Sequence, residues 1–362
     1  MMDCHWNTCA VESDETGISK AHVHEQDVGR MRFGLGDANR VFTERAVVSL
    51  QQRLNDRFGV PLVVRQGEKY IDIVHELVDD VGAERVLWST RFEPGQAETD
   101  TEVANCLRRS GTPVEEHNTF LERDIRSLKV SMNGTRGHFG TMLPFLKSAQ
   151  SQQQDFSTVV PEPSELPSPD LTLSGNTTRG LNAASELRLI TMPKRRDGSV
   201  VDWGSRMMQH WDASEASALS QLQSFIDDGP LDRYENHRHH ADGSAVSKLS
   251  PYLRHGLISS RTIQNELKKR NKNAQTFARR FVWRSLFYWL LWHWPTMPFR
   301  PIREAYSSME WITDEEKNRR FKAWSDGMTG YPLVDAAMRE LWETGWVQQS
   351  ARMTAAAFLI EV

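Results

Sequence analysis

The chain has 362 residues, enough for two domains with sizeable buried cores. Its composition, 39% hydrophobic and 25% charged, is that of a globular protein and excludes wholesale disorder. The formal net charge is −4, yet residues 232–284 hold twelve lysines and arginines against four acidic residues, a local charge of +8. Such a basic segment indicates either a polyanion-binding face or an ordinary solvated helix surface.

The cysteines and apolar runs bear on compartment and partners. Cys4, Cys9 and Cys106 form neither a disulfide framework nor a metal-ligand pattern, so we expect a reducing compartment and no metal. The most apolar run, residues 285–294, is too short to cross a bilayer, and no signal peptide is visible. We therefore expect a soluble intracellular protein without a membrane partner; the sequence indicates neither the nucleus nor any particular organelle.

The first part of the chain alternates helix and strand patterns. Residues 1–30 are polar and predicted to be poorly ordered. Apolar spacing predicts helices over 41–58 and 71–81 and a further helix through Val103 and Leu107. Short apolar runs predict strands at 62–64, at 86–88 and near 113–121. The alternation predicts an α/β domain over residues 31–147 with a parallel, incomplete Rossmann-like sheet.

The second part of the chain has a different character. Residues 148–186 are rich in Ser, Gln, Pro and Gly, which predicts a linker. Helical periodicity follows, so we expect a mostly helical domain over residues 187–362.

Two stretches of this second part are unusually patterned. In residues 324–353, Pro332 suits a first helical turn, Gly345 can close that helix, and a second helix is expected to start near Trp346. In residues 247–259, Ser250 is a predicted helix cap and Pro251 the first helical residue; the free N–H groups there favour a phosphate. Each stretch could equally be ordinary helical structure.

Both stretches resemble the flavin-binding domain of the DNA photolyase/cryptochrome family. The family signature W-x-x-G-x-T-G-Y-P-x-V-D-A-x-M-R-x-L-x-x-x-G-W is matched by Trp324, Gly327, Thr329, Gly330, Tyr331, Pro332, Val334, Asp335, Ala336, Met338, Arg339, Leu341, Gly345 and Trp346. The resemblance covers roughly residues 32–362 and implies an α/β domain followed by an all-α domain that binds FAD. The FAD contacts it implies are Tyr234, Arg238, Ser247, Leu249, Ser250 and Arg352.

The resemblance also implies a surface for damaged DNA. Trp283 aligns with the tryptophan that packs against a flipped-out pyrimidine dimer, although an aromatic-rich helix is more often core. Gln349 aligns with an asparagine near the flavin, and Trp311 with the surface end of a tryptophan electron-transfer chain. The implied DNA contacts are Arg279, Arg280, Trp283, Arg284 and Met353.

Several departures from the family leave three functions open. Dimer photolyases carry glutamate at the position of Arg280 and asparagine at that of Gln349, and no antenna chromophore is expected because Gln96 replaces a contacting glutamate. The chain also resembles a sequence shortened at both ends. The basic segment and Trp283 favour a light-driven photolyase, a carbon–carbon lyase acting on UV-damaged DNA. The alternatives are a cryptochrome-like photoreceptor with a signalling partner, or a degenerate fragment without full flavin binding.

Overall fold

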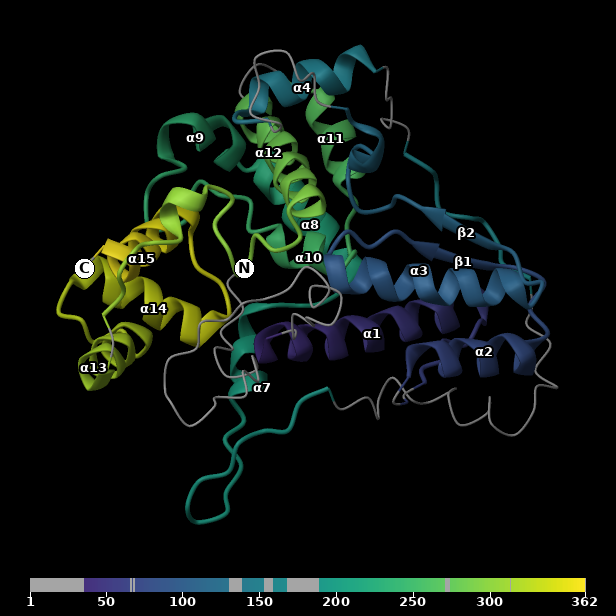
Figure 1. Ribbon diagram of the computed structural model, residues 1–362, viewed down its shortest axis with the longest axis horizontal. Coiled ribbons are helices and arrows are strands. Elements are labelled where there is room, and N and C mark those ends of the chain that lie inside the picture. Colours follow the sequence, from purple (N-terminus) through teal and green to yellow (C-terminus); the bar gives the residue numbers. More distant parts are fainter. Residues whose placement is uncertain are drawn as a thin grey trace.

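The computed structural model describes residues 36–361 except 66, 68, 130–138, 153–158, 168–188, 271–273 and 313. Residues 1–30, predicted to be poorly ordered, lie outside this part. Most described residues are helical (Figure 1). In chain order the main elements are α1 (Asp37–Phe58), α2 (Tyr70–Val81), β1 (Val86–Ser89), α3 (Pro94–Arg109), β2 (Val114–His117), α4 (Met142–Ser151), α7 (Trp203–Met207), α8 (Glu215–Asp227), α9 (Pro230–His237), α10 (Ser250–Arg254), α11 (Ser260–Lys268), α12 (Ala274–His293), α13 (Asp314–Ser325), α14 (Pro332–Thr344) and α15 (Gln349–Glu361).

The α/β part is a βαβ unit with one extra helix. Strands β1 and β2 are parallel, with Val86 opposite Val114 and Ser89 opposite His117, and α3 connects them. Apolar residues of α2, α3 and both strands share a small core that includes Val78, Val103 and Leu107. The predicted α/β class is confirmed, because short apolar strands joined by a helix bury their faces against that helix.

One expectation for this part is wrong. Residues 62–64 form no strand, since a strand needs a hydrogen-bonded neighbour and the described strands pair only with each other. Helix α1, predicted as part of the α/β domain, packs against the helical part: its Phe42 and Ala46 belong to that core. The Phe42 ring also stacks on His255, with centroids 4.6 Å apart.

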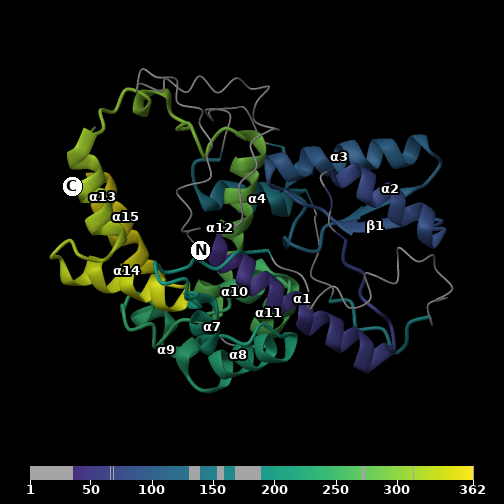
Figure 2. The same cartoon turned by 90° about the horizontal axis from the view of Figure 1, so that it is seen from below.

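The helical part surrounds the long helix α12, which joins two cores. Phe277 and Phe281, from its first half, pack with α8, α9 and α11, whereas Leu286 and Trp289, from its second half, pack with residues of the α/β part and α4. A separate core holds α13, α14 and α15 together. Figures 1 and 2 both place α13–α15 at one end of the molecule and α2 and α3 at the other.

Polar side chains seal the contact between α12 and the α/β part. The Tyr288 hydroxyl donates to Glu93 Oε1 at 3.2 Å, and Arg254 Nη1 lies 3.4 Å from the same oxygen. Burial, with Glu93 adding to it, raises the pKa of Tyr288 to about 12. We call this contact the seam.

Arg284 lies in the same seam. Its Nη1 donates to the Phe120 carbonyl at 2.8 Å, its guanidinium sits 3.9 Å from the Phe120 ring centroid, and Glu122 Oε1 is 3.7 Å away. Burial lowers the pKa of Arg284, while Glu122 opposes that shift. The Arg284 charge is thus held by protein partners, and the DNA contact implied for Arg284 stays a prediction.

The predicted linker starts later than expected. Helix α4 continues to Ser151 because Phe145 and Ala149 are fully buried in the core shared with α12. Within the described ranges, no helix is long and apolar enough to cross a membrane.

Candidate functional site

The site begins with the loop before α14. The carboxylate of Asp335 accepts hydrogen bonds from Thr329 N at 2.7 Å, Thr329 Oγ1 at 2.6 Å and Gly330 N at 3.0 Å. These bonds, the Thr329 hydroxyl first, lower the pKa of Asp335. The signature residues Thr329, Gly330 and Asp335 thus fold their own loop over the start of α14.

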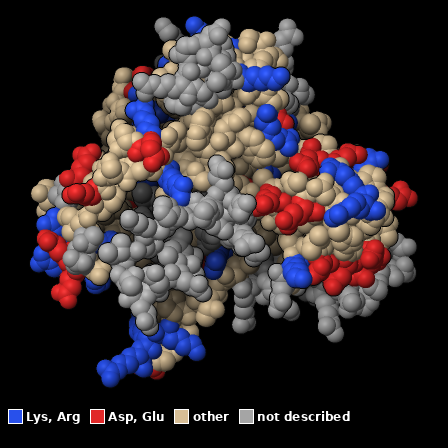
Figure 3. Space-filling view, viewed as in Figure 1, with Lys and Arg blue, Asp and Glu red and all other residues tan. Residues whose placement is uncertain are grey.

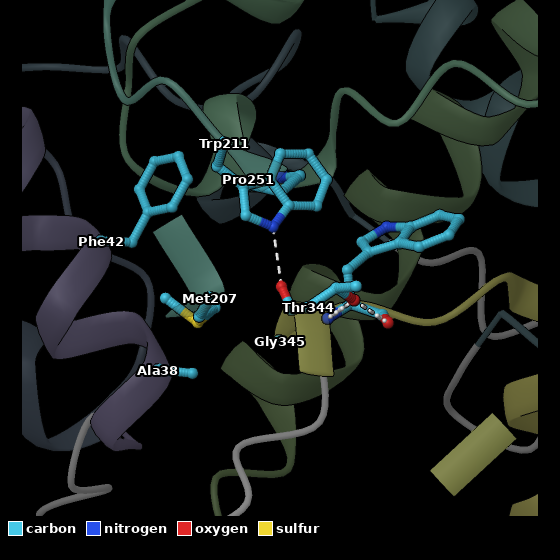
Figure 4. A pocket seen from close by; sticks show the side chains of 8 residues that line it. Ala38, Phe42, Met207, Trp211, Pro251, Thr344 and Gly345 are labelled. Carbon is cyan, nitrogen blue, oxygen red and sulfur yellow. Dashed lines mark hydrogen bonds between the residues drawn. The ribbon is translucent and has the colours of Figure 1, made fainter. Parts of the chain in front are cut away.

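The end of α14 is anchored to the rest of the helical part. Gly345 ends the helix at φ +69°, and a Cβ there would lie 2.7 Å from Met207 Sδ, so only glycine fits. The Trp211 indole donates to the Thr344 carbonyl at 2.7 Å (Figure 4). A small apolar pocket beside this bond is lined by Ala38, Phe42, Met207, Trp211, Pro251, Thr344, Gly345 and Trp346.

The segment between α14 and α15 is hydrogen-bonded to the start of α10. Trp346 Nε1 donates to Ser250 Oγ at 3.2 Å. The prediction that Ser250 caps the helix is wrong. Ser250 is the first residue of α10, and the N-cap position is Leu249, which makes no side-chain capping bond. The second helix of this hairpin begins at Gln349, not near Trp346.

Gln348 is the centre of this contact. Its side chain is fully buried, its Nε2 donates to the Arg238 carbonyl at 2.6 Å, and its Oε1 accepts from Ala351 N at 2.9 Å. It thus joins the residue after α9 to the first turn of α15. Sequence reasoning missed Gln348, because a glutamine beside a second glutamine carries no signal of burial; only packing distinguishes it from the exposed Gln349.

The loop with Ser247 and Leu249 is tightly held. Lys248 has φ +51°, a strained value for a residue with a side chain. Gln221 Nε2 donates to the Ser247 carbonyl at 3.1 Å, and the Lys248 ammonium lies 5.5 Å from the Trp346 ring centroid. Leu249 is buried in the core. Such strain is most often retained where backbone geometry serves a ligand.

Gln348 connects two half-buried arginines, Arg238 and Arg352, through main-chain hydrogen bonds. Arg238 Nε is buried, and no described atom accepts a hydrogen bond from it. Burial alone lowers the pKa of Arg352, one helical turn after Gln348, and no described carboxylate forms an ion pair with it. A buried guanidinium without a protein partner is costly unless an anion completes it.

The start of α12 and α9 supply a second wall. Tyr234 is buried, and its hydroxyl accepts from Arg280 Nε at 3.2 Å. Arg279 is exposed and donates to Thr276 Oγ1 at 2.7 Å. Glu235 lies near both arginines and Arg238, and its hydrogen bond with Thr276, followed by these charges, lowers its pKa. The structure thus brings together Tyr234 and Arg238, implied as FAD contacts, and Arg280, implied as a DNA contact.

Aromatic and apolar surface lies further along α12 and on α15. The Trp283 ring is stacked on Phe287, with centroids 6.0 Å apart, and Phe287 is 55% exposed. Met353, on the outer face of α15 with Gln349, is 60% exposed. Trp311 is 60% exposed, as expected for a surface residue, and lies between α12 and α13. In the described part of the chain, no cluster of side chains is arranged to hold a metal ion.

Comparison with known proteins places this site in a family. Residues 277–362 match the FAD binding domain of DNA photolyase, and residues 10–168 match the DNA photolyase domain. A deoxyribodipyrimidine photo-lyase of Agrobacterium fabrum is 29% identical over 349 residues, which is 95% of this chain and 67% of that protein.

Solved structures agree. A bacterial class III photolyase from Agrobacterium tumefaciens has a TM-score of 0.72 at 28% identity, over 90% of this chain and 64% of that one. The cryptochrome of Synechocystis shares the fold, with a TM-score of 0.69 at 22% identity over the same shares of the two chains. The helical fold, with its two anchored signature loops, is that of a flavoprotein domain. The chain belongs to the DNA photolyase/cryptochrome family, and it spans about two thirds of the length of these relatives.

The residues present fit the cofactor of the matched domain. FAD carries a diphosphate, and the guanidinium groups of Arg238 and Arg352 and the hydroxyl groups of Ser247 and Ser250 are side chains of the kind that bind such an anion. FAD is thus the cofactor expected from both the domain match and the chemistry of these side chains.

Proposed function

We propose that this protein is an FAD-dependent DNA photolyase that splits UV-induced pyrimidine dimers in light. The observation that carries the proposal is the pair of half-buried arginines, Arg238 and Arg352: Arg238 Nε has no described hydrogen-bond acceptor, and no described carboxylate forms an ion pair with Arg352. The hydrogen bonds of Gln348 to Arg238 and of Trp346 to Ser250 connect this region to the strained loop at Lys248, and Arg352 lies within the match to the FAD binding domain.

Each wall of the site would have its own task. Arg238 and Arg352 would neutralise the diphosphate, and the Gln348 bridge would keep Arg238 in place before the cofactor arrives. Tyr234, Ser247, Leu249 and Ser250 would shape the loop around it. FAD, when bound, supplies the light-driven one-electron chemistry of the family.

The DNA side would use stacking and positive charge. Trp283, backed by Phe287, offers a flat face for a base that has been turned out of the duplex. The exposed Arg279 would meet backbone phosphate, whereas Met353 would line the apolar rim. Trp311 would be the surface end of an electron path, and Gln349 would lie at the substrate-facing turn of α15.

Arg280 bears on the lesion that the site accepts. It replaces the glutamate of dimer photolyases, and its Nε now donates to the Tyr234 hydroxyl. In an Arg280→Glu variant, a carboxylate could accept from that hydroxyl instead and could face the dimer. We expect this variant to repair cyclobutane dimers several-fold faster than the wild type, with Arg280→Gln as the matched control. A gain shared by both variants, or no gain, would contradict a dimer-competent pocket.

The decisive experiment combines flavin content with repair. The purified chain should release one FAD on denaturation and should restore dimer-containing DNA under blue light, but not in the dark. Flavin that responds to light without any repair would support the photoreceptor alternative. If no flavin is present even after reconstitution, the proposal fails, and the degenerate-fragment alternative holds.

A further inference from the structure

A narrow hairpin, residues 193–201, projects from the body of the molecule near α7 (Figure 1). Lys194 and Val200 form an antiparallel bridge, and Val201 N donates to the Pro193 carbonyl at 2.8 Å. At its tip, Arg195 N donates to the Ser199 carbonyl at 2.8 Å, and Gly198 takes φ +84°. The tip is therefore a defined turn in which glycine supplies the left-handed residue.

The tip has one acidic residue, Asp197, and its carboxylate is hydrogen-bonded within the turn. The Asp197 carboxylate accepts from Ser199 N at 2.9 Å and from Ser199 Oγ at 2.6 Å. These bonds, the hydroxyl first, lower the pKa of Asp197. Asp197 thus shapes the turn and does not pair with the neighbouring cations.

The three cations of the tip lie together without described acidic partners. Lys194, Arg195 and Arg196 are all exposed, and no described carboxylate forms an ion pair with any of them. Elsewhere, exposed arginines such as Arg206 and Arg320 hold carboxylate partners. Figure 3 shows this basic cluster at the end of the projection. Unpaired like charges repel one another, so grouping them on a projection has a cost unless a polyanion meets them.

We propose that this hairpin is a second DNA contact, which binds the phosphate backbone of undamaged duplex without reading sequence or damage. Three cations on a narrow, ordered tip suit a dense row of phosphates, and such contacts need charge and reach rather than a shaped pocket. An acidic protein surface fits less well, because Val200 is the main apolar side chain that the tip could bury against it.

The position of the hairpin separates it from the dimer site. In Figure 1 it extends from the side of the molecule opposite α9 and α12, where Tyr234, Arg280 and Trp283 lie. The hairpin would therefore hold DNA independently of flavin and of damage, so that the protein stays near DNA between encounters with lesions.

The test is binding of the full chain to a short undamaged duplex in the dark, between about 50 and 200 mM salt. The triple variant Lys194→Gln/Arg195→Gln/Arg196→Gln should bind more weakly at low salt. Its plot of log affinity against log salt should be shallower by roughly 2.7, which is about 40-fold less affinity lost over that salt range. An unchanged Tm would show that the exposed tip is not needed for folding.

The matched control removes the same charge from a paired cluster. Arg319→Gln/Arg320→Gln/Lys322→Gln on α13 removes cations that have Glu316 and Asp326 as partners. The control should leave the salt slope nearly unchanged. An equal effect of both triple variants, or no effect of the hairpin variant, would overturn the proposal. So would hairpin-dependent binding to vesicles of anionic lipid without binding to DNA. Since neither flavin nor light is used, these outcomes leave the proposed repair activity untouched.

Discussion

The seam and the region around Gln348 both contain half-buried arginines, but these arginines differ in the partners that the protein gives them. In the seam, Arg284 has a carbonyl, an aromatic face and Glu122, and Arg254 has Glu93. Around Gln348, Arg238 Nε has no described hydrogen-bond acceptor, and no described carboxylate forms an ion pair with Arg352. The comparison teaches that burial of a charge does not by itself distinguish structure from function. What distinguishes them is whether the protein supplies the partner.

The largest expected effect concerns the seam. Arg284→Met leaves Glu122 without its cation and the Phe120 carbonyl with only the Ser260 hydroxyl as donor, at 3.4 Å, so the free energy of unfolding should fall by about 3–5 kcal/mol. Chemical denaturation monitored by tryptophan fluorescence measures this change. Arg279→Met, on the same helix but exposed, is the control and should change it by less than about 0.5 kcal/mol. Equal effects of the two variants would mean that the seam does not depend on its ion pair.

The next effect is expected at Arg238 and Arg352, where a substitution should change ligand affinity and not stability. Arg238→Met or Arg352→Met should each lower FAD affinity roughly 10- to 100-fold, because a charge-assisted hydrogen bond contributes about 1.5–3 kcal/mol. The stability of the flavin-free protein should not fall, since no described ion pair is broken. Titration with FAD and denaturation of the flavin-free chain measure the two quantities. Destabilisation with unchanged FAD affinity would assign these arginines to structure.

A smaller effect is expected at Trp283, on the proposed DNA-binding side of the site. Trp283→Ala should weaken binding of dimer-containing DNA by about 1–3 kcal/mol, the amount of one stacking contact, with little change in FAD content. Binding to the same duplex without the dimer is the internal comparison and should hardly change. If both duplexes lose affinity equally, Trp283 packs the core and does not recognise the lesion.

The smallest effect is expected at high pH and again concerns the seam. Tyr288 has a pKa of about 12 in the folded protein and about 10 when unfolded. Its contribution to stability is therefore complete below pH 10 and is lost as the pH rises towards 12. Tyr288→Phe should flatten this alkaline decrease, as measured by unfolding at several pH values, whereas Tyr306→Phe, at an exposed position, should not. An alkaline decrease that is identical in wild type and Tyr288→Phe would rule out this assignment.

Local patterns predicted much of the fold. The helices that became α1, α2, α3 and α14, the strands β1 and β2, and the end of α14 at Gly345 follow from apolar spacing and turn residues within a few positions of each element. The predicted strand at 62–64 was wrong because strand pairing, unlike strand propensity, depends on a distant segment. An apolar triplet has strand propensity, but a strand exists only if another segment presents a free edge.

The sequence by itself therefore determined the class of the protein, the order of its elements and most residues that surround the site. Only the tertiary structure decided which of two similar residues, close together in the sequence, is buried against protein partners and which is not. It placed Arg280 against Tyr234 but turned Arg284 into the seam, and it buried Gln348 while leaving Gln349 exposed. It also moved α1 onto the helical core. The physical reason is that the partner of a charge or a buried amide comes from a segment far away in the chain, and no local pattern records it.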